Sequence, residues 1–170
     1  MGNLATPEFL IDRWQQLCQD PFLEDLPYKI ELNAWGKIEM TPPAGNRHSH
    51  LQGVLVTELK RQLSGVVLPE CALLTRIGIR APDVCWASAE FFARFGEITP
   101  YTHAPEICIE VRSRSNVQAE MDEKTAAYLA AGASEVWIVS EDGTIRYFTA
   151  SGEQPRSGFP VSITLPPPIG

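Results

Sequence analysis

The chain has 170 residues, of which 44% are hydrophobic and 21% are charged, and its formal net charge is −7. These values are typical of one globular domain with its own core, and they exclude a disordered or low-complexity chain. No apolar run reaches the roughly 18 residues of a membrane span, so we expect no transmembrane helix. An acidic chain does not bind DNA through its bulk charge, so any contact with nucleic acid must rest on a local basic patch.

The four cysteines, at positions 18, 71, 85 and 108, form no CxxC pair, and the three histidines do not complete a zinc-binding spacing. Four cysteines in a chain of this length do not make a disulfide scaffold. We therefore expect a reducing, cytoplasmic protein with small buried thiols. The N-terminus lacks a basic start followed by an apolar stretch, so we also expect no secretory signal.

The first predicted elements are a helix and a β-hairpin. Residues 7–19 place their large apolar side chains at helical spacing, and Pro21 ends the helix. Residues 28–32 and 37–40 alternate apolar and polar side chains, which predicts two strands. A turn at residues 34–36 joins them.

A second helix is predicted over residues 48–63, because four leucines recur at every fourth position and form one apolar stripe. Gly65 fits the left-handed C-cap of this helix. Further short elements follow, namely strands at residues 65–68, 72–80 and 83–86 and a short helix at 87–95.

The apolar segment 107–111 predicts a buried strand. Ser115 and Asn116 then offer an N-cap for a helix over residues 117–131, and Gly132 fits the end of that helix.

Two more strands are predicted at residues 135–139 and 144–149, and the Gly- and Pro-rich tail beyond residue 151 is expected to run along the surface. The strands and longer helices follow the order αββαβββ and then βαββ. This order predicts an α/β (α+β) fold in which helices pack on a mixed sheet.

Two acidic residues stand out because of their positions in or beside strands. Asp83 follows a proline where the chain changes direction, and Glu110 lies inside the apolar strand 107–111. Side chains alternate between the faces of a strand, so the three aliphatic residues share one face and Glu110 shares the other with Cys108 and Arg112. An unpaired carboxylate is costly to bury, so Glu110 needs a cation, a hydrogen-bond donor or water.

The helix after this strand can supply a partner. Met121, Lys124 and Tyr128 are spaced by three and four residues, so they share one helix face. Lys124 then lies toward the sheet, where its aliphatic stem can pack while its amine reaches toward Glu110.

Several segments together resemble a known family. The segments are Pro82-Asp83, residues 105–116, the helix at 123–133 with the strand after it, and the stretch from 31 to 48. They resemble the Uma-type putative restriction endonuclease family, which is part of the PD-(D/E)XK nuclease superfamily. The resemblance covers about residues 28–150. It implies a single restriction-endonuclease-like domain over residues 1–170, with a mixed sheet flanked by helices, an N-terminal helix and hairpin, and a tail at 151–170.

The resemblance also implies roles for individual residues. Asp83 and Glu110 match the two acidic positions of the motif and would bind Mg²⁺, or Mn²⁺ as a substitute, with the carbonyl of Val111 as a third oxygen ligand. Such a metal lowers the pKa of a bound water and stabilises charge on the phosphate. Arg112 stands where the motif has a lysine, and it cannot act as a base because it stays protonated. Lys124 matches the lysine that replaces it in this family, which makes Asp83, Glu110 and Lys124 the catalytic candidates.

Four further residues are candidates for substrate binding. Arg112 can grip a phosphate, Ser113 can donate to one, and His48 and Gln52 lie one helical turn apart and can line the same cleft. Three of them also have a purely structural interpretation, namely helix capping or surface exposure for His48, the end of a strand for Ser113 and a solvated surface for Arg112. Relatives often carry a glutamate near the position of Val54, and its absence leaves two acidic ligands.

The same acidic residues allow structural interpretations. Asp83 can cap a turn, Glu110 can form an ion pair with Lys124 or Arg112, and Lys124 can be a solvated surface lysine. Three functions therefore stay open. The first is a Mg²⁺-dependent endonuclease acting on DNA, working as the homodimer that the resemblance implies. The second is a non-catalytic member of the fold that acts as a binding or interaction module, and the third is a hydrolase of small phosphorylated molecules.

Overall fold

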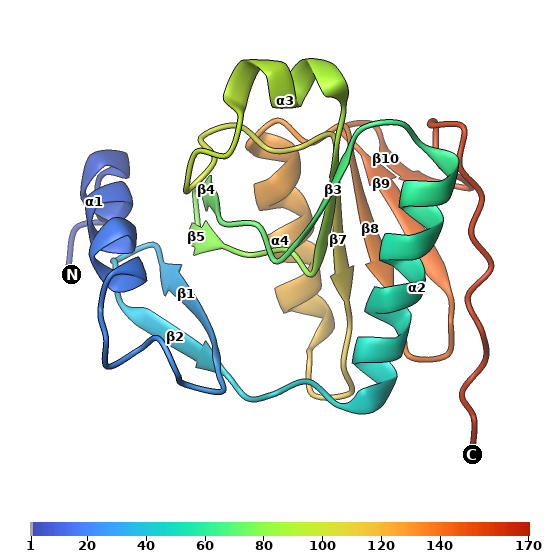
Figure 1. The fold of residues 1–170 in the computed structure, drawn as a ribbon, viewed down its shortest axis with the longest axis horizontal. Helices are drawn as coiled ribbons and strands as arrows, with labels where there is room; N and C mark the ends of the chain where they lie inside the picture. Colours follow the sequence, from blue (N-terminus) through green and yellow to red (C-terminus); the bar gives the residue numbers. More distant parts are fainter. Residues whose placement is uncertain (1) are drawn as a thin grey trace.

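The computed structural model describes residues 2–170 and arranges them as helices around two β-sheets (Figure 1). The helices are α1 (Pro7–Cys18), α2 (Asn46–Gln62), α3 (Ala89–Phe95) and α4 (Gln118–Ala130). None of the helices in this part of the chain has the length and apolar character needed to cross a membrane.

The larger sheet has six strands in the order β10-β9-β8-β7-β6-β3. Its strands are β3 (Val66–Pro69), β6 (Val84–Ala87), β7 (Ile107–Val111), β8 (Glu135–Val139), β9 (Ile145–Thr149) and β10 (Gly152–Gln154). The β7–β8 pair is parallel because α4 connects these strands, whereas the other pairs are antiparallel. The expected mixed sheet is therefore confirmed.

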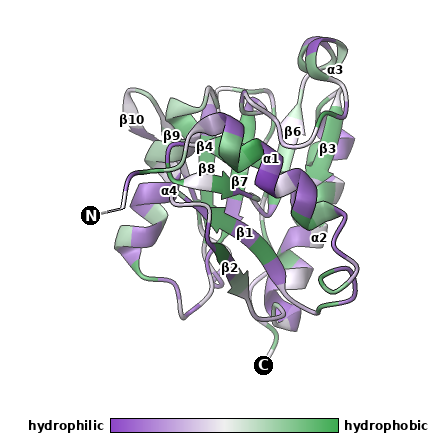
Figure 2. Ribbon diagram, turned by 90° about the vertical axis from the view of Figure 1, so that its left-hand side faces the viewer, coloured by the Kyte–Doolittle hydropathy of each residue, from purple (hydrophilic) through white to green (hydrophobic). Residues whose placement is uncertain are grey.

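The two faces of this sheet are covered by different helices. The leucine stripe of α2 packs on the face that carries Ile107, Ile109 and Val111. Met121 and Tyr128 of α4 pack on the opposite face, as the alternation along β7 predicts. Figure 2 looks along the sheet and shows α4 and α2 on either side of it.

The smaller sheet has four antiparallel strands in the order β2-β1-β5-β4. They are β1 (Lys29–Asn33), β2 (Ile38–Thr41), β4 (Leu73–Thr75) and β5 (Gly78–Arg80). Helix α1 packs on it through Leu10 and Trp14, which form a separate small core with Leu32 and Ile79.

The single strand predicted over 72–80 is wrong, because this segment is the β4–β5 hairpin. Gly78 has φ +111°, and a Cβ there would collide with the carbonyl oxygen of Leu32. The Thr75 hydroxyl donates to the Gly78 carbonyl and accepts from Ile77 N–H, which closes the turn.

Two predicted helix caps are also wrong. Helix α2 ends at Gln62 and its C-cap residue is Leu63, whose backbone is extended, so Gly65 does not cap it. Helix α4 has Val117 as its N-cap residue, because the Asn116 side chain accepts from Ser113 N–H and closes the preceding loop instead.

The C-terminal tail was expected to run along the surface, but part of it belongs to the sheet and the core. Strand β10 pairs with β9, and Leu165 is buried in the core beside α2, where Phe159, Val161 and Ile163 also pack. Alternating apolar residues in the tail therefore extend the core, and Figure 1 shows the C-terminal segment running beside α2.

The cysteines partly differ from expectation. All four are free, and Cys85 and Cys108 are buried, but Cys71 is only partly buried and Cys18 is exposed at the end of α1.

Candidate functional site

A cleft of about 550 Å³ lies between the two sheets and contains the predicted acidic residues. Its lining includes Lys29 and Glu31 from β1, Asp83 immediately before β6, Glu110 from β7 and Lys124 from α4. These charged groups come from both sheets, so the N-terminal hairpin completes the cleft.

Asp83 is 4% exposed and is held by three donors. Its Oδ1 lies 3.1 Å from Lys29 Nζ, and its Oδ2 accepts from Val111 N–H at 2.7 Å and lies 3.2 Å from His48 Nε2. Burial alone would raise the pKa of Asp83, but the His48 hydrogen bond, the Lys29 charge and the Val111 N–H outweigh it and hold the pKa well below its usual value. Asp83 is therefore ionised at neutral pH.

Glu110 is equally buried but has a different environment. Its Oε1 accepts from the Tyr128 hydroxyl at 2.5 Å and lies 3.4 Å from Lys124 Nζ. Burial and the nearby charge of Asp83 raise the pKa of Glu110 to about 7, against the attraction of Lys124 and Lys29. Within residues 2–170 no hydrogen bond reaches Glu110 Oε2, and Glu110 lines the cleft.

The two lysines balance the two carboxylates. Burial lowers the pKa of Lys29, but Glu110, Asp83 and Glu31 raise it further, so the net shift is upward. The pKa of Lys124 is raised in the same way, with burial opposed mainly by Glu110. Both amines are thus ammonium ions; Lys29 pairs with Asp83 and Lys124 with Glu110, and Lys124 Nζ also lies 3.9 Å from Glu120 Oε1.

A second charged group supports the chain just before Asp83. The Glu31 carboxylate accepts from Ala81 N–H at 2.8 Å and lies 3.4 Å from Arg80 Nη1. Arg80 also pairs with Glu39 of β2 at 2.5 Å. These bonds tie the end of β5 to the N-terminal hairpin and so fix the approach of the chain to Asp83.

The structure brings Asp83, Glu110, Lys124 and His48 together, as the sequence analysis expected of a shared site. Gln52 is one turn from His48 but donates to the Asp83 backbone carbonyl at 2.8 Å, so it holds the chain there.

Of the remaining predicted residues, some line the cleft and Arg112 does not. Val111 and Ser113 line the cleft. The Ser113 hydroxyl is bonded to Asn116 Oδ1 at 2.9 Å. Arg112 is directed into the β7–α4 connection, where its guanidinium donates to the Asn116 carbonyl and to Gln118 Oε1. The structure therefore gives Arg112 a role in the loop and shows no contact between it and either carboxylate.

Sequence reasoning missed two residues that contact the carboxylates. The sequence pattern does not single out Lys29, and it places Tyr128 on the helix face of Lys124 without predicting its hydrogen bond to Glu110. The alternation in β1 was a usable signal for Lys29, because Lys29 and Glu31 share the face opposite Ile30 and Leu32. Nothing in the sequence showed that this polar face folds over Asp83.

The donor set limits which metal could bind. Among residues 2–170, no group of three or more His, Cys, Asp or Glu side chains is arranged to hold an ion. Two carboxylates facing one cleft instead fit Mg²⁺, which takes one or two carboxylates and completes its coordination with water and substrate phosphate. They do not fit a closed, protein-only site such as that of structural zinc.

Residues 12–169 match the Uma2 family model, described as "Putative restriction endonuclease". The chain belongs to this family. A solved structure from Anabaena variabilis ATCC 29413, described as a putative nuclease belonging to DUF820, is 21% identical to this Uma2 chain. It aligns with a TM-score of 0.60 over 85% of this chain and 91% of that one, which confirms the expected restriction-endonuclease-like fold. No curated protein matches the chain in sequence.

Proposed function

We propose that this Uma2 chain is a Mg²⁺-dependent endonuclease that hydrolyses DNA phosphodiester bonds. The observation that carries the proposal is a pair of buried carboxylates that face one cleft together with two ammonium groups. Asp83 immediately precedes β6, and Glu110 lies in the neighbouring antiparallel strand β7. Isolated buried carboxylates are costly, so a fold that retains two of them beside an open cleft favours a functional use.

The proposed metal ligands are Asp83, Glu110 and the Val111 carbonyl, with Mn²⁺ as a substitute for Mg²⁺. The metal would supply an activated water and neutralise charge on the scissile phosphate. Tyr128 holds Glu110 Oε1 by its hydroxyl, which leaves Oε2 for the ion. Val111 N–H and His48 hold Asp83 in place through its Oδ2.

The lysines have separate proposed tasks. Lys124 stabilises the negative charge that develops on the phosphate oxygens, because its ammonium already points into the cleft beside Glu110. Lys29 neutralises Asp83 until substrate and metal arrive. Each lysine pairs with a carboxylate, so the two cations would provide the local positive charge that DNA binding needs in a chain of net charge −7 only once Mg²⁺ occupies the carboxylates. We place substrate contact at Ser113 and His48, since both line the cleft.

One observation favours a different function. Each carboxylate already has a lysine partner, and Val54 packs against the core where relatives often carry a glutamate. A site neutralised by its own lysines can persist in a member of the fold that binds a partner without cleaving it. This binding-module function predicts that neither Mg²⁺ nor Mn²⁺ binds with useful affinity.

We further propose that the chain works as a homodimer in the cytoplasm. Two sites in one dimer could address the two strands of a duplex, and the resemblance to dimeric relatives supports this arrangement. The four free cysteines suit a reducing compartment. Light scattering on the purified chain gives the oligomeric state, and a monomeric mass would contradict the dimer.

The test is cleavage of supercoiled plasmid and of single- and double-stranded oligonucleotides with Mg²⁺, with Mn²⁺ and with EDTA. We expect metal-dependent cleavage that Asp83→Asn and Glu110→Gln abolish, while Glu58→Gln, on α2 and outside the lining of the cleft, retains it. If both site variants cut as well as the wild type, the assigned site is wrong. Hydrolysis of a small aryl phosphodiester without any cleavage of DNA would favour the third function, a hydrolase of small phosphorylated molecules.

A further inference from the structure

Three of the four cysteines gather on the α4 side of the six-stranded sheet. Cys85 Sγ lies 3.0 Å from Cys71 Sγ and 3.9 Å from Cys108 Sγ. Cys85 and Cys108 are directly opposite each other on β6 and β7. The thiols therefore form one contiguous cluster.

The cluster lies directly beside the candidate site. Cys108 and Glu110 share one face of β7, because they are two residues apart. Cys71 follows Glu70, which lines the cleft and whose N–H donates to the Asp83 carbonyl at 3.2 Å. The β3–β4 connection that carries Cys71 is thus tied to the backbone of Asp83.

We propose that Cys71 and Cys85 form an oxidisable dithiol that closes to a disulfide and fastens the β3–β4 connection to β6 beside the cleft. A disulfide needs the two sulfurs at about 2.05 Å, so the thiols must approach by about 1 Å. Cys71 lies outside the regular strands, between β3 and β4, so this connection can make the movement without breaking a strand pairing.

The solvent exposure of the three thiols defines the order in which they react. Cys71 is partly exposed, whereas Cys85 and Cys108 are 0% exposed, so a hydroperoxide meets Cys71 first. The Cys71 sulfur takes one oxygen from the hydroperoxide and becomes a sulfenic acid, and an alcohol (or water, from hydrogen peroxide) leaves. The Cys85 sulfur then displaces that oxygen as water and forms the S–S bond. The two thiols lose two electrons and two hydrogens in total, and the peroxide is reduced by the same two electrons.

Two other pairings are less favourable. Cys108 is farther from Cys85, and both of these residues are held in paired strands, so neither backbone can move to shorten the distance. Cys18 is exposed at the end of α1, on a different element, and is not part of the cluster.

The test uses the full chain treated with dilute hydrogen peroxide, followed by thiol titration and tryptic peptide mapping without reductant. Arg76 and Arg80 lie between Cys71 and Cys85, so trypsin separates the two cysteines unless a disulfide joins them. We expect the free thiols to fall from four to two per chain, with one Cys71–Cys85 peptide pair that is lighter by two hydrogens and is released by dithiothreitol. The oxidised chain should also have a higher Tm, because the new bond restricts the unfolded state.

Matched variants make the result specific. Cys18→Ser should retain the linked pair, whereas Cys71→Ser should lose it, and Cys85→Ala provides a second loss variant at the buried partner. A Cys85–Cys108 link, thiol loss confined to Cys18, or Cys71 converted to sulfinic acid without any link would overturn the proposal. An unchanged or lower Tm of the disulfide-linked protein would contradict the claim that the fold accepts the Cys71–Cys85 disulfide without strain.

Discussion

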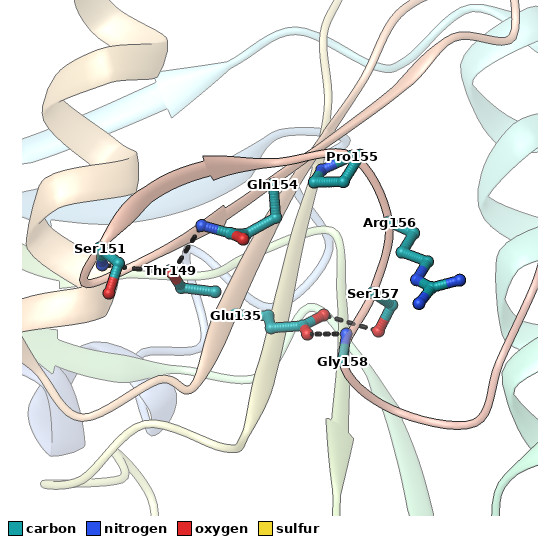
Figure 3. Close-up of a pocket in the computed structure, with 8 residues that line it drawn as sticks. All are labelled: Glu135, Thr149, Ser151, Gln154, Pro155, Arg156, Ser157 and Gly158. Atoms are coloured by element: carbon teal, nitrogen blue, oxygen red, sulfur yellow. Dashed lines mark hydrogen bonds between the residues drawn. The ribbon is translucent and has the colours of Figure 1, made fainter.

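Two buried glutamates on neighbouring strands, Glu110 of β7 and Glu135 of β8, are both 3% exposed and yet have opposite surroundings. Glu135 accepts hydrogen bonds from Trp137 Nε1, Ser157 Oγ and Gly158 N–H. Figure 3 shows Ser157 and Gly158 reaching Glu135 from the C-terminal segment. Glu110 instead contacts one hydroxyl and one ammonium group and borders the cleft between the sheets.

The difference separates a structural carboxylate from a functional candidate. Fixed neutral donors satisfy Glu135 completely and use it to attach the tail to the sheet. Among residues 2–170 no donor reaches Glu110 Oε2, and burial beside Asp83 raises the pKa of Glu110 to about 7. A carboxyl group whose ionised form is disfavoured by its surroundings, and which borders a cleft, is a candidate for binding a cation.

The largest expected effect is on cleavage by Glu110→Gln. We expect a loss of about 10³-fold or more, because the variant removes a metal ligand that stabilises transition-state charge. Its thermal stability at pH 8 should equal or exceed that of the wild type. The pKa of Glu110 is about 7 in the folded state and 4.5 in the unfolded state, so protonation of Glu110 stabilises the fold. This stabilisation is lost as the pH rises from 4.5 through about 7. Glutamine mimics the protonated form, so the variant keeps the stabilisation at pH 8. A large fall in Tm at pH 8 would make Glu110 a structural residue like Glu135.

Glu135→Ala should show the opposite pattern. We expect a loss of about 3 kcal/mol in the free energy of unfolding, because three donors lose their shared acceptor in a buried position. Urea unfolding measures the change. Metal binding and any cleavage by the folded fraction should be unchanged, and a variant as stable as the wild type would contradict the tail-anchoring role.

Lys124→Met tests the cation beside Glu110 while keeping the aliphatic packing of the side chain. Cleavage should fall by about 10²-fold, as expected for removal of one group that stabilises developing charge. Mn²⁺ binding should persist, since no metal ligand is removed. Loss of metal binding with this variant would show that Lys124 holds the site together instead of acting on substrate.

Lys29→Met should have the smallest effect of the four. Its ammonium occupies Asp83 Oδ1, so an incoming metal must displace it. We expect Mn²⁺ affinity to rise by about tenfold in this variant, equivalent to about 1.4 kcal/mol. Calorimetric titration measures the change, and a weaker affinity would show that Lys29 supports the metal site.

Much of the site was predictable from local patterns. The alternation along β7 placed Glu110 on the face of the sheet that α4 covers. The three- and four-residue spacing in α4 placed Lys124 on the helix side that faces Glu110. The same two periodicities predicted α2, β7 and β8. Local chain signals failed where a long-range contact decides the structure, as at Gly78, where the close approach of Leu32 leaves no room for a Cβ.

Pairings between distant segments were the least predictable part. The β1–β2 hairpin is positioned over Asp83 by the pairing of β1 with β5 and by Arg80, which contacts both Glu31 and Glu39, and no periodicity encodes these contacts. Glu110 stood out inside its apolar strand, whereas no local pattern indicated that Glu135, at the start of β8, is equally buried. Their roles differ because Ser157 and Gly158 return to Glu135, 22 and 23 residues along the chain.

The most direct test of the central claim is calorimetric titration of Mn²⁺ into the wild type, Glu110→Gln and the matched control Glu135→Gln, each verified as folded by circular dichroism. The account predicts saturable binding in the wild type and in Glu135→Gln and its loss in Glu110→Gln. The result that would contradict it is an absence of binding in all three proteins, or binding that Glu110→Gln leaves unchanged. Absence of binding would favour the binding-module function, with Glu110 and Lys124 as a structural ion pair.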